Sequence, residues 1–566
     1  MDDSSSKAVL AMLGNLPKRP RPPLSEAVGD VAVTLDRENL ALVVRLARAF
    51  RHANPKRRPS SVCLALISGR GPDDLRRAIS NLEGDAFDYA VASIYSLLLS
   101  DERRRELGAY FTPPYLVKHL LNRLADHGFD CVEHSAHDPA AGGAAFVVPL
   151  VRMTASALLK SGVKRADLRR QLARRLSGTE LDSGLARVAN ALIGRTLNEE
   201  FGLKVSKAFS LVRVGNSLSK RDAIANVVVG NPPYAKIGAD RQRQVARAFP
   251  DILGGQLNLY AMFLRRSMDW VKPGGLVGFV VPTSFLQGPE FETLRIALLE
   301  RGDLMCVDLI EKRSGVFLDV VQDACFVVLR RRLNDKLGNG GPTTCALVKA
   351  TGQTEHQGVI TLGASGTPWV LPYADGMHPG TSVLSDYGYR CSVGYLVANR
   401  QAKRLRISPG KGRVALARAA CIRPNGSFDL AAVDRRYVTV PKDAPYIVRS
   451  PCVALQRTAN RKQAKRLNAA AVSARTVKGV SGIVGENHVL FLLPVGKPRI
   501  SPTAMARLMS SGPVNARWAR ICGTISVSAK LLSTLRLPHP ERVVCLSKVA
   551  RSEVDAVVSA AYELHD

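Results

Sequence analysis

The chain has 566 residues, of which 46% are hydrophobic, and a net charge of +32. This length predicts two to four domains with real cores, and no apolar run approaches about 20 residues, which excludes a membrane span. Lys and Arg outnumber Asp and Glu by 80 to 48. Such an excess favours a nucleic acid partner, because each neutralised phosphate releases counterions. The alternative is a generally basic proteome with many surface arginines.

The cysteines exclude two classes of site. All ten are scattered, without a CxxC pair or zinc-finger spacing. We therefore expect no metal site and a reducing, cytoplasmic location. The N-terminal apolar stretch precedes its basic residues, the wrong order for a signal peptide.

The hydrophobic patterns divide the chain into regions. Residues 1–35 are basic and proline-rich, which predicts loose order, and 36–105 repeat apolar residues at helical spacing. In 106–332, short apolar runs alternate with helical stretches, which predicts an α/β domain with a mostly parallel sheet. A Gly- and Asn-rich stretch, 333–344, is a linker candidate. Residues 345–566 are less regular and are predicted to form a separate domain.

Two motifs lie where strands of a parallel sheet are expected to end, and ligands bind at that edge. In "HDPAAGGAAF", Asp138 closes a short segment, and Gly142 allows a tight turn before a helix. A plain strand–helix turn is the alternative. In "LSGTELDSGLARVANAL", Glu180 is placed to bind ribose hydroxyls, whereas Asp182 is equally suited to cap the following helix.

The stretch "NVVVGNPPYAKIG" carries the most specific pattern. Pro232 and Pro233 fix their φ angles and lack amide donors. Asn231 adds a side-chain acceptor beside the Pro232 main-chain acceptor, and two fixed acceptors suit an amine with two N–H bonds. Tyr234 offers a flat face for stacking. The stretch therefore predicts a site for a planar, amino-bearing group.

"GAYFTPPYLVKHLL", "DPAAGG" and "NPPY", in this order, resemble the gamma-class N6-adenine DNA methyltransferases of restriction–modification systems. The resemblance covers roughly 106–332. It implies a Rossmann-like methyltransferase fold with a mostly parallel seven-stranded sheet, S-adenosyl-L-methionine as cofactor, and methyl transfer to N6 of adenine in double-stranded DNA after base flipping. We also expect a monomer, and by analogy with the family a separately encoded restriction endonuclease.

The resemblance assigns residues position by position. "DPAAGGA" stands where the family has "DPACGSG", and Asn216 stands where the family has an Asp near the cofactor adenine. Phe317 matches an aromatic residue that packs on the flipped base, although a core phenylalanine is the alternative. The implied cofactor-binding residues are Tyr110, Phe111, Thr112, Pro113, Asp138, Ala140, Gly142, Glu180 and Asn216. The implied catalytic residues are Asn231, Pro232, Pro233, Tyr234 and Phe317.

The C-terminal region resembles a DNA target-recognition domain. Its segment "QRTANRKQAKRL" contains Arg457, Lys462 and Arg466, which are candidates for phosphate contacts. A solvated basic face is the alternative.

Three other functions stay open. The "NPPY" element also serves methyltransferases that act on RNA or on protein glutamine. Asn216 in place of Asp would suit a catalytically silent DNA-binding subunit. A fused restriction enzyme is disfavoured, because the region before Gly108 lacks a "PD…(D/E)xK" nuclease pattern.

Overall fold

A computed structural model gives the fold of the chain. It describes residues 37–108, 111–206, 209–219, 223–254, 258–310, 324–333, 342–349, 352–360, 362, 366–369, 380–458, 465–521 and 526–563. Tyr110, Phe317 and Lys462, three of the predicted site residues, lie outside the described residues. The described chain divides into two compact units, one from 37–99 and 117–215, the other from 100–116 and 216–563.

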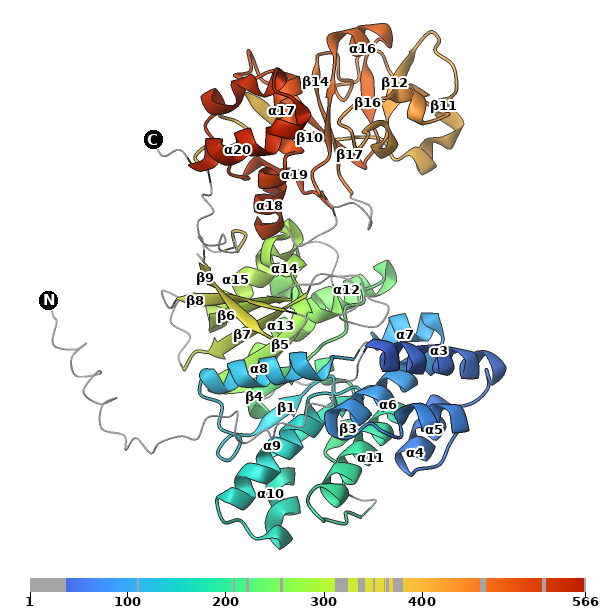
Figure 1. Cartoon of the computed structure of the whole chain (residues 1–566), viewed down its shortest axis with the longest axis vertical. Coiled ribbons are helices and arrows are strands. Elements are labelled where there is room, and N and C mark those ends of the chain that lie inside the picture. Colours follow the sequence, from blue (N-terminus) through green and yellow to red (C-terminus); the bar gives the residue numbers. More distant parts are fainter. Residues whose placement is uncertain are drawn as a thin grey trace, which may run out of the picture. The chain divides into compact units, whose positions relative to one another are not determined.

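The first unit begins with helices where the sequence predicts them (Figure 1). These are α3 (Arg37–Ala53), α4 (Pro59–Ile67), α5 (Asp73–Ile79) and α6 (Gly84–Leu98). Nearly the whole of α6 is buried, because α3, α4 and α11 (Ser183–Glu199) pack around it. Arg152 on α9 (Val147–Lys160) pairs with Asp88 of α6 at 2.6 Å and with Glu200 at 2.8 Å, which compensates the buried charges.

Three parallel strands form the sheet of this unit, in the order β3-β2-β1. They are β1 (Ala136–Asp138), β2 (Leu176–Glu180) and β3 (Val212–Val214). The connecting helices are α9, α10 (Leu168–Arg175), which follows the short turn η1 (Arg165–Asp167), and α11; most of α8 (Pro114–Asp126) also belongs here. Because the strands are parallel, Asp138 and Glu180 both lie at the carboxyl edge.

The second unit contains six further strands in the order β4-β5-β7-β6-β8-β9. They are β4 (Ala225–Gly230), β5 (Val271–Pro282), β6 (Gly302–Ile310), β7 (Ala324–Arg331), β8 (Thr343–Val348) and β9 (Thr354–Ile360). The α/β class is confirmed, but the pairing is mixed: β4–β5 and β6–β8 are parallel, and β7 is antiparallel to both neighbours. β8 begins inside the expected linker, so the sheet continues past the expected domain boundary.

α-Helices and 3-10 helices flank these strands. They are α7 (Asp101–Leu107), η2 (Ser217–Ser219), α12 (Ala239–Ala248), η3 (Pro250–Ile252), α13 (Leu259–Trp270), α14 (Ser284–Gln287), η4 (Pro289–Phe291) and α15 (Glu292–Arg301). α13 packs on β5 and α15 packs on β6.

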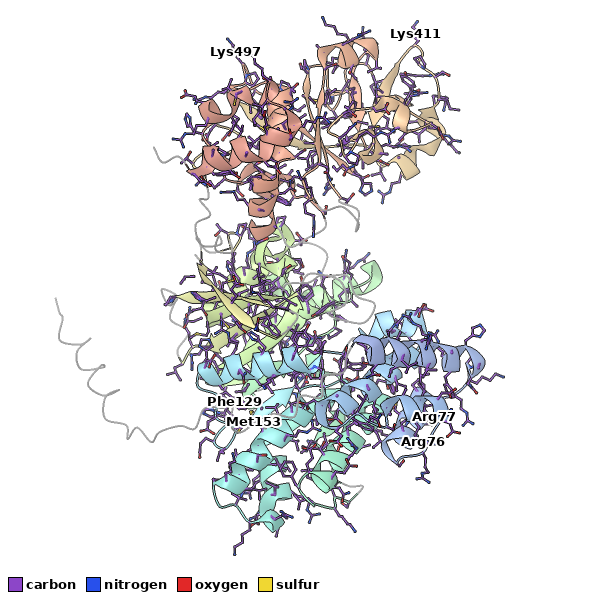
Figure 2. The ribbon with its side chains drawn as sticks, in the orientation of Figure 1. Arg76, Arg77, Phe129, Met153, Lys411 and Lys497 are labelled. Carbon is purple, nitrogen blue, oxygen red and sulfur yellow. The ribbon has the colours of Figure 1, made fainter. Side chains whose placement is uncertain are left out.

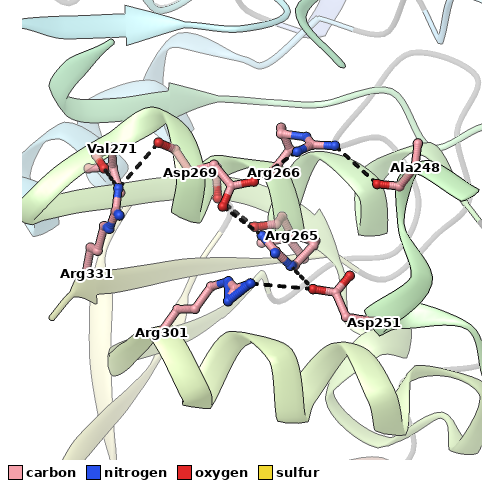
Figure 3. A network of polar contacts seen from close by, with 10 residues as sticks. Ala248, Asp251, Arg265, Arg266, Asp269, Val271, Arg301 and Arg331 are labelled. Carbon is pink, nitrogen blue, oxygen red and sulfur yellow. Dashed lines mark hydrogen bonds and ion pairs between the residues drawn. The ribbon is translucent and has the colours of Figure 1, made fainter. Parts of the chain in front are cut away.

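Two buried arginines fix α13 in place (Figure 3). Arg265 pairs with Asp251 and, at 3.0 Å, with Asp269, and Arg266 reaches the same Asp269 at 3.0 Å. Arg331, on β7, donates to the carbonyl of Val271 at 2.6 Å. The network thereby holds the start of β5, the strand beside β4.

The C-terminal part of this unit has two four-stranded sheets. One has the order β10-β17-β14-β15, formed by β10 (Tyr389–Val393), β14 (Cys452–Gln456), β15 (Ala469–Val472) and β17 (Val489–Pro494). The other has the order β11-β13-β12-β16, formed by β11 (Leu405–Arg406), β12 (Arg413–Ala417), β13 (Tyr437–Thr439) and β16 (Ile483–Gly485). The α-helices are α16 (Ala474–Gly479), α17 (Pro502–Met509), α18 (Gly512–Ile521), α19 (Ala529–Ser533) and α20 (Val554–Glu563). The 3-10 helices are η5 (Ala398–Arg404), η6 (Ala419–Cys421), η7 (Leu430–Ala432), η8 (Pro540–Ser547) and η9 (Arg551–Glu553).

Candidate active site and nucleic-acid surface

The loop after β1 is built around backbone N–H groups. Asp138, at the end of β1, is 1% exposed, and its Oδ1 accepts the N–H of Ala140 at 2.9 Å. Burial raises the pKa of Asp138 to about 8. Gly142 adopts a left-handed φ of 54°, and its N–H donates to Glu180 Oε2 at 2.9 Å. The loop and the acid after β2 are therefore joined, as a shared cofactor site requires.

Glu180 ends β2 and is 8% exposed. Its Oε1 accepts the N–H of Asp182 at 2.8 Å, so each carboxylate oxygen receives one backbone donor. A carboxylate has about four lone-pair sites, so acceptor capacity remains for a hydroxyl donor. Burial raises the pKa of Glu180. The group fits a ribose diol, while Asp182 caps α11 through the N–H of Leu185 at 2.9 Å.

Sequence reasoning missed one position in this loop. Ala144 occupies the seventh place of the "DPACGSG" pattern, where the family has glycine, and it adopts φ 63° although it is buried. A left-handed conformation is unfavourable for alanine by about 1–2 kcal/mol. The family's glycine at the seventh place of the pattern indicates a left-handed conformation there, and this chain has Ala144 instead.

Asn231 follows β4, whose last four residues are all buried. Its Nδ2 donates to Thr112 Oγ1 at 3.0 Å, and Thr112 is 2% exposed. Its Oδ1 is buried and has no hydrogen-bond partner among the described residues. Such an acceptor costs about 1–3 kcal/mol when nothing donates to it. The amide is therefore held with its oxygen available to a donor that the chain itself does not supply.

The residues around Asn231 hold the turn rigid. The Tyr234 hydroxyl donates to the Val280 carbonyl at 3.3 Å, and its ring meets Tyr260 edge-on with centroids 6.1 Å apart. Gly108 has φ 58°, and a Cβ there would lie 2.6 Å from Pro233 Cβ. Glycine at 108 thus allows the chain that carries Phe111, Thr112 and Pro113 to approach the "NPPY" turn. The sequence reading had assigned no role to Gly108.

Asn216 lies in the loop after β3. It is exposed, and its Oδ1 accepts the N–H of Leu218 at 3.1 Å, which forms the turn that starts η2. Asn and Asp side chains commonly make this contact with the backbone two residues on. One lone pair of Asn216 Oδ1, the atom expected to contact the cofactor, thus accepts a backbone N–H instead.

The two described arginines of the basic C-terminal segment have mainly internal contacts. Arg457 is half-buried and donates to the Asn487 carbonyl at 3.0 Å. Arg466 is 9% exposed, and its backbone N–H donates to Asn515 Oδ1 at 2.8 Å. The structure therefore does not place the Arg466 side chain on the surface, because the segment folds onto α18.

A different part of the C-terminal region combines charge with exposed aromatic surface. Residues 394–449 contain 12 Lys and Arg against three Asp and Glu. Tyr395 is 65% exposed, and its ring stacks on Tyr446 with centroids 4.1 Å apart and planes 9° apart. Lys411 lies in the same lobe and extends outward (Figure 2). An exposed, stacked ring in a basic lobe is suited to a nucleic acid.

The described residues lack two kinds of feature. They contain no group of three or more His, Cys, Asp or Glu side chains arranged to hold a metal ion. Within the same residues, no helix has the length and apolar character needed to cross a bilayer. The nine cysteines in this part of the chain are free.

Residues 195–317 match the family described as Eco57I restriction-modification methylase. The type II methyltransferase M.BsuBI of Bacillus subtilis is 22% identical over 62% of this chain and 72% of its own length. M.BanIII of Aneurinibacillus aneurinilyticus is 26% identical over 39% of this chain, which spans only 38% of that relative. The fold is similar to that of a nuclease-deletion mutant of the Type ISP restriction-modification enzyme LlaGI solved with a DNA substrate mimic, with TM-score 0.50, 10% identity and coverage of 95% of this chain and 59% of the other.

The matched segment contains Asn216, the "NPPY" turn and Phe317. The predicted cofactor, S-adenosyl-L-methionine, is confirmed by the similarity to methyltransferases. The resemblance inferred from the motifs is likewise confirmed: residues 195–317 are similar to the methylase domain of restriction–modification enzymes.

Proposed function

We propose that the protein methylates N6 of adenine in double-stranded DNA as the modification enzyme of a restriction–modification system. The observation that carries this proposal is the buried, unpartnered Oδ1 of Asn231. The exocyclic amine of adenine is a planar group with two N–H donors, and one of them satisfies this oxygen. The Pro232 carbonyl, fixed by the two prolines, is the second acceptor.

The arrangement also explains why the Asn231 amide must not rotate. With Nδ2 bound to Thr112, the side chain offers oxygen, and not nitrogen, to the substrate amine. Accepting both N–H bonds favours a tetrahedral nitrogen, whose lone pair then becomes available for attack. When bound, S-adenosyl-L-methionine supplies an electrophilic methyl group on a sulfonium. Positioning of the amine by the Asn231 and Pro232 acceptors supplies much of the rate.

Adenine must leave the duplex to reach this turn, at a cost of a few kcal/mol. The ring of Tyr234 is anchored through its hydroxyl to Val280 and through its edge to Tyr260, so it is a pre-ordered stacking surface. Stacking offsets about 1–3 kcal/mol of the cost. Phe317 is proposed as a second stacking residue, on the resemblance alone.

On the cofactor side, Glu180 is proposed to accept the ribose hydroxyls, and the loop of Asp138, Ala140 and Gly142 to approach the cofactor closely. Phe111, Thr112 and Pro113 are proposed for its methionine end. Asn216 retains one free lone pair for the adenine of the cofactor.

DNA binding is proposed for the C-terminal region, where 380–566 contains 30 Lys and Arg against 10 Asp and Glu. The lobe of 394–449, with Tyr395 and Tyr446, is the part with the most favourable surface. A monomeric state, a cytoplasmic location and a separately encoded nuclease remain predictions.

The test is methyl transfer from labelled S-adenosyl-L-methionine to unmethylated genomic DNA, comparing wild type with Asn231→Ala, followed by digestion to nucleosides. We expect N6-methyladenine with the wild type and none with the variant. Label in RNA or protein but not in DNA would redirect the proposal to those acceptors. Tight DNA binding without transfer to any acceptor would support a silent subunit.

A further inference from the structure

A tyrosine from the N-terminal helices reaches the loop after β2. The hydroxyl of Tyr95, on α6, donates to Asp182 Oδ1 at 2.6 Å. Tyr95 is 3% exposed, so bulk water does not compete for this bond. Burial, and next the bond to Asp182, raise the pKa of Tyr95, so the group is a neutral donor at physiological pH.

Asp182 also contacts Glu180. Its backbone N–H donates to Glu180 Oε1 at 2.8 Å, while its Oδ1 also accepts from Leu185 at 2.9 Å at the start of α11. Rotation of the Asp182 side chain would therefore disturb both the helix cap and the peptide that orients the Glu180 carboxylate. The hydroxyl of Tyr95 is a donor that resists this rotation.

The first turn of α11 is shaped around the same hydroxyl. A Cβ on Gly184 would lie 2.7 Å from Tyr95 Oη and 3.1 Å from Asp182 Oδ1. Both distances are shorter than ordinary contacts, so any other residue at 184 would displace the hydroxyl or the carboxylate. Glycine is here a requirement of space.

We infer that Tyr95 is a positioning residue of the cofactor site and that Gly184 is the position that admits it. The inference rests on the proposed role of Glu180 as the ribose acid. The inference gives the N-terminal helices a function: Tyr95 on α6 helps to fix the orientation of Glu180 through Asp182. Tyr95 itself touches neither the cofactor nor the reacting atoms.

The test measures the dissociation constant of S-adenosyl-L-homocysteine on the full chain by calorimetry. Tyr95→Phe keeps the packed ring and removes only the hydroxyl; we expect the constant to rise about three- to tenfold. Gly184→Ala should raise it in the same direction, although alanine is the better helix former. The double variant should add little to the larger single effect, because both changes act on one contact.

Tyr387→Phe is the matched control. Tyr387 is fully buried in the C-terminal core and donates to the Pro538 carbonyl, also at 2.6 Å. The same chemical change there should lower the thermal midpoint without weakening cofactor binding. A structural role alone would make Tyr95→Phe behave like this control.

The outcomes distinguish failure of the Tyr95 inference from failure of the proposed cofactor site. A wild-type dissociation constant for Tyr95→Phe, or equal weakening in Tyr387→Phe, overturns the inference while leaving the proposed function intact. Glu180→Ala serves as the reference: if it binds the probe as tightly as the wild type, Glu180 is not the ribose acid, and the proposed cofactor site fails together with the inference.

Discussion

Thr112→Val is the sharpest perturbation of the proposed catalytic turn. Valine keeps the shape of threonine at a site that is 2% exposed, but it removes the acceptor for Asn231 Nδ2, which lies 3.0 Å away. The amide then loses the contact that selects its orientation, and its donor stays buried without a partner. A loss of about 1–3 kcal/mol predicts a fall in kcat of roughly 5- to 150-fold.

Steady-state methyl transfer at varied cofactor concentration separates the two roles proposed for Thr112. Loss of amide orientation lowers kcat and leaves KM for S-adenosyl-L-methionine unchanged. Thr112→Ser retains a hydroxyl and should recover most of the rate. A wild-type kcat in Thr112→Val, or an increase confined to the cofactor KM, would refute the orienting role and assign Thr112 to cofactor binding alone.

Three further outcomes are expected. Asn231→Ala, which we expect to be inactive, should change the thermal midpoint little, since loss of the hydrogen bond to Thr112 is offset by removal of a buried acceptor that lacks a donor; a clear decrease in thermal midpoint would contradict this. Tyr395→Ala should weaken DNA binding by roughly tenfold in fluorescence anisotropy at fixed salt, whereas Ile407→Ala, 63% exposed in the same lobe, should not. The pKa of Asp138 is raised from 3.8 to about 8, so the folded chain retains a proton that the unfolded chain releases across that range. The contribution of Asp138 to the unfolding free energy without cofactor should therefore fall as pH rises from about 4 to about 8, and Asp138→Asn should flatten this slope in urea titrations.

The sequence was sufficient for features that depend on neighbouring residues. The valines before Asn231 predict β4, and the two prolines predict a fixed turn after it. Acid–glycine patterns likewise locate the loops after β1 and β2. These predictions succeeded because strand burial and turn chemistry are local properties.

Contacts between distant segments could not be predicted from the sequence. The donor–acceptor pair of Asn231 and Thr112 spans 119 residues, and that of Tyr95 and Asp182 spans 87. Neither residue type nor spacing reveals which hydroxyl reaches which side chain. Arg466 shows the same limit, because a basic run does not reveal which of its side chains is buried when the backbone binds Asn515.

Strand direction was equally non-local. The apolar runs of β6 and β7 look alike in sequence, yet β7 is antiparallel to both of its neighbours. The glycine-rich stretch before Thr343 looks like the end of a domain, but β8 follows it and pairs with β6 from Cys306 to Ile310. Only the partner strand determines that outcome.

The pairing of β8 with β6 has a consequence for protein engineering. Exchange of recognition regions between related enzymes would naturally be made at the apparent linker near residue 344. With a junction there, the donor enzyme would supply β8. The backbone N–H and C=O groups of β6 would then have to pair with a foreign strand. Chimeras joined after Ile360 keep β8 and β9 with the chain that pairs with them, and should give the higher yield of folded protein.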